Sequence, residues 1–510
     1  MSANDLYLTT EQDLTTVAEA IRTRGGTSEA LEYPDGFASA IAAIPGNVEV
    51  QEKDVNFYDY DGTLLYSYTK AQALALSALP ENPSHEGLTA QGWNWTLAEI
   101  QAELTTYPDQ FIQVGQMYTT TSGKTEIEIE LTDSNFLSPY IFFAVNGTAI
   151  IEWGDNTTPT TLTGASLATV INSEPHTYSS AGKYTITIAI SEGGTYCFKG
   201  NSTDASVLRQ ENRPNERIYT QSVKKIRFGT GARTGAYAFM GCINLETVTL
   251  NQDAMVYATN YALRSCVSLK HITIPRNENH TSLGTSIVEN GHSIKNISLP
   301  KTITTLNNSN FAFCASIKRI GIPSSITSMA GSVFASCENL EKVYMPGITS
   351  LNYISIFEVC YKLKEIRFSS SISGDIGMEA FSNCTSLTVA TIPSNAETIN
   401  STAFNGCTNL SVVQLPNTIK SIKGSCFINC TGIRGPIVFP ATLTEIGNQA
   451  FSGCYNIYEY HFLGTVPPTF GTKCFNNYPT GAKIYVPRGY LSAYQTAGST
   501  YASIMEEEPA

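Results

Sequence analysis

The sequence predicts a multidomain, mainly β protein in which a long repeat solenoid follows a β-sandwich, a small α+β module and a helical N-terminal segment. Three patterns predict this: cysteines at a fixed spacing, strand-like alternation before them, and helix-like periodicity at the start. The chain has 510 residues, of which 42% are hydrophobic and 15% charged. This composition indicates a folded chain with several cores or one long stack, and excludes wholesale disorder.

The cysteines define the repeat. Nine of the twelve recur at intervals of 23 or 24 residues, apart from one double step of 48 in which Gly291 fills the missing position. A period of about 23 residues is typical of stacked solenoid units. We expect each of these cysteines to be a small buried hydrophobe, since no histidine or cysteine cluster has metal-ligand spacing. The ten positions, called rungs below, are Cys242, Cys266, Gly291, Cys314, Cys337, Cys360, Cys384, Cys407, Cys430 and Cys454.

Each unit has the same apolar skeleton. In one of them Phe404, Cys407 and Leu410 recur at steps of three, which favours a short helical turn with one buried face. Val413 and Leu415 then alternate with polar residues, as in a strand with one face inward. One unit cannot bury its apolar face alone, so the units are expected to stack.

The skeleton Ala-Phe-x-x-Cys-x-x-Leu-x-x-Val-x-Leu-Pro resembles the BspA-type leucine-rich repeat family. The resemblance runs from about Val223 to Pro487 and implies a leucine-rich-repeat solenoid over 221–488, closed by a C-terminal cap and followed by a tail at 489–510. It also implies a role in adhesion or surface recognition.

Residues 120–200 alternate as short strands separated by Gly and Asn-Thr turns, which predicts a β-sandwich. The strings Ile151-Glu152-Trp153-Gly154-Asp155 and His176-Thr177-Tyr178 resemble the PKD family, which implies an immunoglobulin-like spacer. His176 is then a structural residue. A polar connector at 201–220 leads into the solenoid.

Residues 47–119 are expected to form a small α+β spacer that begins with a hairpin turning at Asp61-Gly62. Two helices are predicted in this module, over 69–79 and 97–105. The module resembles the B-repeats of bacterial surface proteins. The string around Asp59 and Asp61 also resembles the first motif of haloacid dehalogenase phosphatases, which would make these residues nucleophile and general acid. That remote alternative lacks alternating βα units and a second acidic pair for magnesium.

Residues 1–46 carry two short helical patterns with an apolar face and little local core to bury it. Their sequence resembles the N-terminal segment of tail and virion-surface proteins of phages and prophages. The resemblance implies docking onto other tail proteins. The residues predicted to dock are Leu14, Val17, Ile21, Phe37 and Ile41.

Charge and missing motifs limit the function classes. The net charge of −13 argues against nucleic-acid binding, and no apolar run is long enough to cross a membrane. No catalytic set, cofactor motif or metal cluster is expected, so the protein is predicted not to be an enzyme. With no secretion signal in the sequence, we expect a virion tail protein for host attachment, made in the host cytoplasm, with a cellular surface adhesin as the alternative. A homo-oligomer stays open.

The expected recognition surface is the outward face of the strands. The outward positions lie five and seven residues after each rung, and Arg319, Lys342, Tyr344, Glu365 and Arg367 should gather there on adjacent strands. A ring flanked by cations suits a glycan or an anionic polymer, whereas a surface of paired charges is the alternative. The seventh-place residues are Thr249, Thr273, Ser298, Gly321, Tyr344, Arg367, Thr391, Gln414, Ile437 and His461.

Overall fold

The computed structural model describes residues 52–134, 137–173, 175–199, 208–210, 218–255, 259–369 and 371–509. The chain divides into two units, Met1–Glu52 and Lys53–Ala510. The predicted docking helices in residues 1–46 lie outside the described residues, as does most of the predicted connector. The larger unit contains the small α+β domain, the region predicted as a β-sandwich, and the solenoid.

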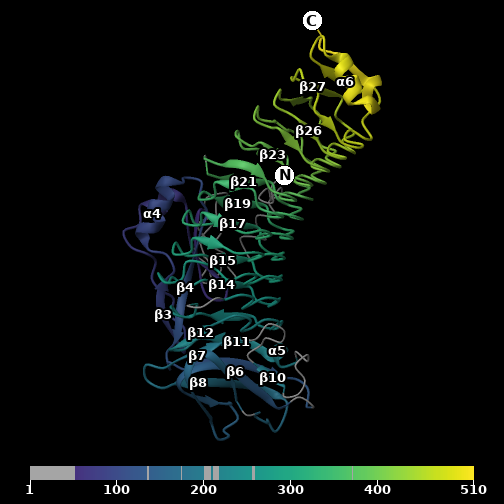
Figure 1. Cartoon of the computed structure of the whole chain (residues 1–510). Coiled ribbons are helices and arrows are strands. Elements are labelled where there is room, and N and C mark those ends of the chain that lie inside the picture. Colours follow the sequence, from purple (N-terminus) through teal and green to yellow (C-terminus); the bar gives the residue numbers. More distant parts are fainter. Residues whose placement is uncertain are drawn as a thin grey trace, which may run out of the picture. The chain divides into compact units, whose positions relative to one another are not determined.

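Residues 53–119, called the module below, form a four-stranded sheet with the order β2-β1-β4-β3 and two helices (Figure 1). The predicted hairpin is confirmed, because β1 and β2 pair antiparallel and Gly62 takes a positive φ of 88° in the turn between them. The helix predicted at 69–79 is shorter, because Gln101 donates to the carbonyls of Leu74 and Leu76. The elements are β1 (Val55–Tyr58), β2 (Leu64–Tyr68), α3 (Lys70–Leu74), β3 (Leu88–Trp93), α4 (Leu97–Thr106) and β4 (Ile112–Thr120).

The region predicted as a β-sandwich, with the strands from β5 to β12, forms one sheet with the first repeat strand in the described residues, so the two-sheet sandwich is not confirmed. Strand β5 pairs antiparallel with β8 on one side and with β11 on the other, and β11 pairs in parallel with the first repeat strand, β13. One hydrophobic core continues from Ile127 to Met505. The region predicted as a separate spacer is therefore continuous with the solenoid, because β5 and β11 are neighbours in one sheet. The elements are β5 (Thr125–Leu131), β6 (Pro139–Glu152), β7 (Thr160–Asn172), β8 (Gly182–Ile190), β9 (Thr195–Phe198), β10 (Leu208–Gln210), α5 (Ile218–Ser222), β11 (Val223–Arg227) and β12 (Ala232–Thr234).

His176 has the structural role that the sequence predicts. Its ring stacks on Trp153 with centroids 4.6 Å apart, and its Nε2 lies 2.7 Å from an Asp155 carboxylate oxygen. The Asp155 pKa is lowered, by hydrogen bonds from Thr157 and His176 that outweigh its burial. The three side chains fix the loop after β6.

The solenoid stacks its turns through two sets of short parallel strands. The first set carries the outward residues five and seven places after each rung, and its exposed side is called the strand face below. Figure 1 shows the turns as a ladder from β12 to β27 that changes direction beyond β21. The first set is β13 (Thr247–Thr249), β14 (His271–Thr273), β15 (Asn296–Ser298), β17 (Arg319–Gly321), β19 (Lys342–Met345), β21 (Glu365–Phe368), β25 (Ile437–Phe439) and β27 (Glu459–Phe462). The second set is β16 (Thr305–Leu306), β18 (Ser328–Met329), β20 (Ser350–Leu351), β22 (Ser373–Ile376), β23 (Thr398–Ile399), β24 (Ser421–Ile422), β26 (Glu445–Ile446) and β28 (Thr469–Phe470).

The rung cysteines are buried free thiols. The thiol of Cys407 donates to the Phe381 carbonyl of the preceding turn at 3.1 Å, and the same bond recurs in neighbouring turns. Burial raises the pKa of Cys337, Cys407 and Cys454 to about 12. Phenylalanines stack alongside, from Phe311 to Phe451. The predicted role of the cysteines as small hydrophobes is confirmed.

The predicted tail is part of the C-terminal cap. Strand β30 extends the strand face by pairing in parallel with β29, and Tyr494 and Tyr501 are buried against the last turn. Polar residues of the last helix face outward, so the cap ends the apolar stack. The elements are β29 (Lys483–Val486), α6 (Leu491–Ala497), the 3₁₀ helix η1 (Ser499–Ile504) and β30 (Met505–Glu507).

Candidate functional site

The five predicted ligand residues come together on β17, β19 and β21. Arg319 lies opposite Lys342, Lys342 opposite Glu365, and Tyr344 opposite Arg367. Arg367 Nε donates to one Glu365 oxygen at 2.7 Å, and Lys342 Nζ lies 3.1 Å from the other. The hydrogen bonds from Arg367 and Lys342 hold the pKa of Glu365 below its usual range. These charges are therefore paired with one another, as the alternative interpretation expects.

Tyr344 does not offer the open ring that the sequence suggested. Its side chain is only 8% exposed, because Phe111 of the module lies over it with ring centroids 6.2 Å apart. The Arg319 guanidinium lies 3.9 Å from the centroid of Phe111 and 5.7 Å from that of Tyr344. The ring and the cation are thus occupied by the protein itself.

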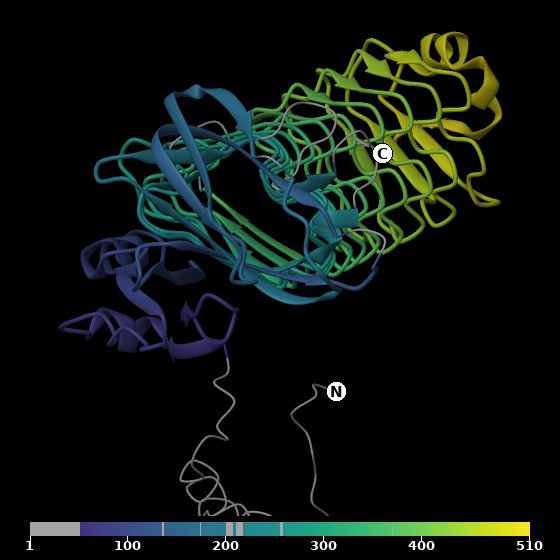
Figure 2. The same ribbon diagram turned by 90° about the horizontal axis from the view of Figure 1, so that it is seen from below.

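The module covers the strand face over several turns. Strand β4 contacts β13, β14, β15 and β17, and Figure 2 shows the module, in purple, beside the stack of turns. The backbones approach closely: a Cβ on Gly321 would lie 1.5 Å from the Phe111 carbonyl oxygen, and one on Gly115 would lie 2.1 Å from Thr273 Oγ1. The small seventh-place residues were predicted to be solvated. Instead Thr249, Thr273, Ser298 and Gly321 are buried beneath the module.

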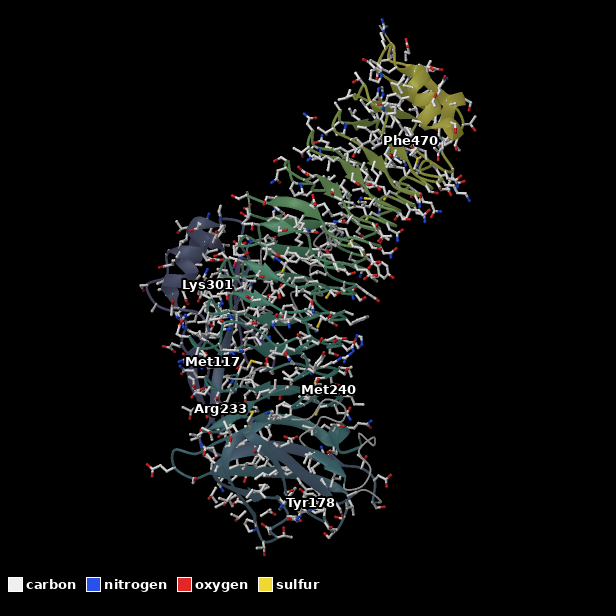
Figure 3. The ribbon with its side chains drawn as sticks, in the orientation of Figure 1. Met117, Tyr178, Arg233, Met240, Lys301 and Phe470 are labelled. Carbon is white, nitrogen blue, oxygen red and sulfur yellow. The ribbon has the colours of Figure 1, made fainter. Side chains whose placement is uncertain are left out.

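A buried carboxylate fixes the far end of the module. Glu103 of α4 accepts hydrogen bonds from Lys301 Nζ at 2.6 Å and from the Ser324 hydroxyl and amide at 2.6 and 2.8 Å. The Glu103 side chain is 1% exposed, and Gln110 Nε2 lies 3.1 Å from it. Figure 3 shows Lys301 on the solenoid beside α4. Because Lys301 and the hydrogen-bond donors together compensate the buried Glu103 carboxylate, they fix the position of the module on the turns.

Further hydrogen bonds join the module to the turns. Asn94 donates to the Ile274 and Ser298 carbonyls, Trp95 to Leu299 at 2.7 Å, and Gln110 to Ile322 at 2.8 Å. The module has a small core of its own, separate from that of the solenoid. Hydrogen bonds from module side chains to backbone carbonyls of the solenoid therefore join two separately packed cores.

Among the described residues, the module covers the strand face only as far as β19 and reaches the edge of β21 with Asp109. The turns from Cys242 to Cys337, with strands β13 to β19, are called the covered half below. The turns from Cys360 to Cys454 are called the bare half, in which the outward residues Arg367, Thr391 and Gln414 are exposed.

One predicted outward position in the bare half is wrong. Ile437 is buried and Val438 is exposed, because the turn of Cys430 has one extra residue before its strand. A shift of one residue exchanges the inward and outward side chains. The same shift leaves Gly435, the predicted outward residue five places after Cys430, outside strand β25.

Two hollows adjoin Arg367, where the bare half begins. One of about 280 Å³ is bordered by the module loop 106–110 and by Tyr344, Arg367 and Phe368. The other, of about 440 Å³, lies between β21 and the following turn and is bordered by Ile366, Arg367 and Val389. A weak ion pair of 3.7 Å joins Arg367 to Asp109. Sequence patterns missed both hollows because neither follows from the repeat.

The two aspartates of the phosphatase-like motif accept hydrogen bonds within the module. Asp59 is buried and accepts a hydrogen bond from the Tyr118 hydroxyl at 2.7 Å, with His85 Nε2 2.7 Å from its other oxygen. Burial and the neighbouring Asp59 raise the pKa of Tyr118. Asp61 accepts from the Thr63 amide within the hairpin turn.

Across the described stretches, no group of three or more His, Cys, Asp or Glu side chains converges to hold a metal ion. None of the helices in that part of the chain has the length and apolar character needed to span a bilayer. The predicted docking residues Leu14, Val17, Ile21, Phe37 and Ile41 lie outside the described residues.

Comparison with protein families identifies the repeat. The model of the BspA type leucine rich repeat region matches residues 232–364 and 353–481, in six copies. The chain therefore carries BspA-type leucine-rich repeats, as the skeleton around the rungs predicts. No curated relative matches the chain at a significant level.

Several solved structures are similar to the chain. A leucine-rich repeat protein from Bacteroides ovatus is 20% identical, covering 61% of this chain and 90% of its own, with a TM-score of 0.32. A leucine rich cell surface protein from Faecalibacterium prausnitzii is 19% identical over 62% and 91%, with a TM-score of 0.31. The pneumococcal vaccine antigen PcpA is 12% identical over 61% and 82%, with a TM-score of 0.36.

Proposed function

We propose that this chain is a non-enzymatic recognition protein that uses the bare half of its strand face to bind an extracellular surface. The observation that carries the proposal is a group of exposed apolar side chains on the strand face of the bare half. Val389 is 53% exposed and Val412 and Val438 are each 45% exposed, although the module buries the same face over the covered half. Exposed apolar side chains gathered on one face are typical of a binding surface.

The setting that we favour is the surface of a bacterial cell, where the protein acts as an adhesin. The BspA-type repeats support this, because the family resemblance implies adhesion and surface recognition. The partner is then a protein or a glycan of the surface that the cell contacts.

A virion tail protein for host attachment is the second candidate. The N-terminal sequence favours it, because the string from Leu8 to Ile41 is similar to that of phage tail proteins. In that setting residues 1–46 dock onto other tail proteins, and the bare half contacts the host. Immunogold labelling separates the two settings: label on cell walls supports the adhesin, and label on phage tails supports the virion protein.

The binding surface is tested by adding a charge to it. Fluorescent full-length protein carrying Val412→Asp should bind target bacteria at least tenfold more weakly than the parent in flow cytometry. Val466→Asp introduces the same change at a 75% exposed valine outside the strand face and should leave binding unchanged. Equal binding by both folded variants would remove the bare half as the recognition surface.

A further inference from the structure

Strand β21 has a free edge in the middle of the strand face. The sheet β17-β19-β21 ends there, and the next turn contributes only the isolated bridge between Val389 and Val412. At the equivalent place of another turn, Ile322 N donates to the Tyr344 carbonyl of the following turn at 2.8 Å. Within the described ranges, no backbone hydrogen bond joins Ile366 or Phe368 to the turn that follows. Their amides and carbonyls are left to solvent or to a ligand.

The sequence departs from the repeat at this point. The sixth residue after the rung is a valine or isoleucine in the neighbouring units, including Val343, Ile366 and Val413. In the turn of Cys384 it is Ala390. The hollow of about 440 Å³ lies beside this turn, and in it Ile366 and Phe368 are only half-buried and Val389 is exposed. The hollow therefore adjoins a turn in which one small residue departs from the repeat.

Charge and position indicate what would fill the hollow. Its bordering residues Lys364, Glu365 and Arg367 sum to one net positive charge, on a protein whose net charge is −13. Glu365 is already paired with Arg367 and Lys342. Lys364 pairs with Glu341, and Arg367 with Glu365 and Asp109, but the side chains of both cations are more than half exposed. Each cation therefore keeps donors for a ligand carboxylate.

The hollow also continues an existing interface. Arg367 borders both this hollow and the smaller one at loop 106–110, where the module leaves the strand face. Over the covered half, the extended strand β4 lies on this face. An extended chain that began beside Asp109 would continue that cover over the bare half.

We propose that the groove beside β21 binds an extended segment of a partner protein, which adds to the free edge as a strand. The proposal rests on the proposed function and specifies the partner's chemistry. The segment forms backbone hydrogen bonds with Ile366 and Phe368, places alternate apolar side chains over Ala390, and sets a carboxylate beside Arg367 or Lys364. Backbone bonding supplies affinity and the hollow supplies specificity.

The test uses the full-length chain and a phage-displayed library of random linear dodecapeptides as the probe. Enriched peptides should alternate apolar residues and carry Asp or Glu. A selected peptide should bind Ala390→Val, which restores the repeat residue beside the hollow, at least tenfold more weakly than the parent. Ala441→Val, the same change at an exposed position elsewhere, should leave its affinity unchanged. Thermal melts establish that both variants are folded.

Hydrogen exchange tests the strand addition itself. The bound peptide should slow exchange of the amides of Ile366 and Phe368 and leave those of β25 unchanged. The proposal is overturned if no peptide is enriched, if the peptides bind Ala390→Val as tightly as the parent, or if a glycan array yields the ligand that Ala390→Val loses.

The two proposals fail in different ways. If Val412→Asp abolishes binding to cells but Ala390→Val does not, the bare half stands as the recognition surface and the groove is not its peptide site. If neither variant affects cell binding, the proposed function is wrong as well.

Discussion

The covered and bare halves of the strand face share one repeat but differ in what lies on it. Inward residues are alike in both halves, and the ladder of rungs continues through them, with Gly291 in place of one cysteine. The outward residues differ: Ser298 and Gly321 are small and lie beneath the module, whereas Arg367 and Gln414 are larger and exposed. The repeat therefore determines the core residues, whereas the size of the outward residues depends on whether the module covers the turn.

The largest effect should come from the buried contact that holds the module on the covered half. Glu103→Ala leaves Lys301 without its buried partner, which should lower the free energy of unfolding by about 3 kcal/mol. Urea unfolding followed by tryptophan fluorescence measures this, because Trp95 lies at the contact.

The matched control is an exposed pair where the covered half meets the bare half. Glu341→Ala removes the partner of Lys364, which lies 3.3 Å away. Exposed pairs contribute little, so the change should be under about 0.5 kcal/mol. Equal losses for the two variants would contradict the polar contact as the anchor of the module.

The second effect concerns the close approach of two backbones. Gly321→Ala places a methyl group against the Phe111 carbonyl and should cost about 2 kcal/mol, since neither backbone can move away easily. Gln414→Ala, at the same repeat position in the bare half, should be nearly neutral. Thermal melts compare the two, and a stable Gly321→Ala protein would mean that the module does not lie on this strand.

The third effect is a pH dependence confined to the covered half. Burial lowers the pKa of His271, which lies under Tyr58 of the module, to about 4. A histidine with a lowered pKa adds stability above its unfolded value of about 6.5 and loses it as the pH falls toward 4. Melting temperatures of the parent should therefore fall more steeply over that window than those of His271→Asn. Equal pH dependence of the melting temperatures of the parent and of His271→Asn would show that His271 is not buried by the module.

The smallest effect should come from restoring the repeat residue beside the hollow. Ala390→Val adds two methyl groups at a position where neighbouring turns have valine or isoleucine, so stability should change by less than about 1 kcal/mol. A loss several times larger would mean that the turn of Cys384 is already closely packed, as it would be if the sheet were unbroken there.

The repeat could be predicted from sequence because each turn depends on local spacing. Cys407 and its neighbours show the period, the buried thiols and the strand positions directly. The hairpin at Gly62 was equally visible, since the turn requires a positive φ.

The position of the module on the strand face could not be predicted in this way. The contacts of Glu103 with Lys301 and of Phe111 with Tyr344 join residues about two hundred positions apart, and no period links them. A signal was present in the small residues Ser298 and Gly321, but small residues on an outward strand position also suit solvent. The same ambiguity made Tyr344 resemble an open ligand platform.

Hydrogen exchange of the intact protein tests the division of the strand face most directly. The central claim is that the chain's own module occupies the covered half and leaves the bare half free. Amides of β15 and β17 should exchange slowly, and those of Ile366, Phe368 and residues 388–391 should exchange at least a hundredfold faster. Uniform protection along the whole face, or faster exchange in β15 and β17 than in 388–391, would contradict the account.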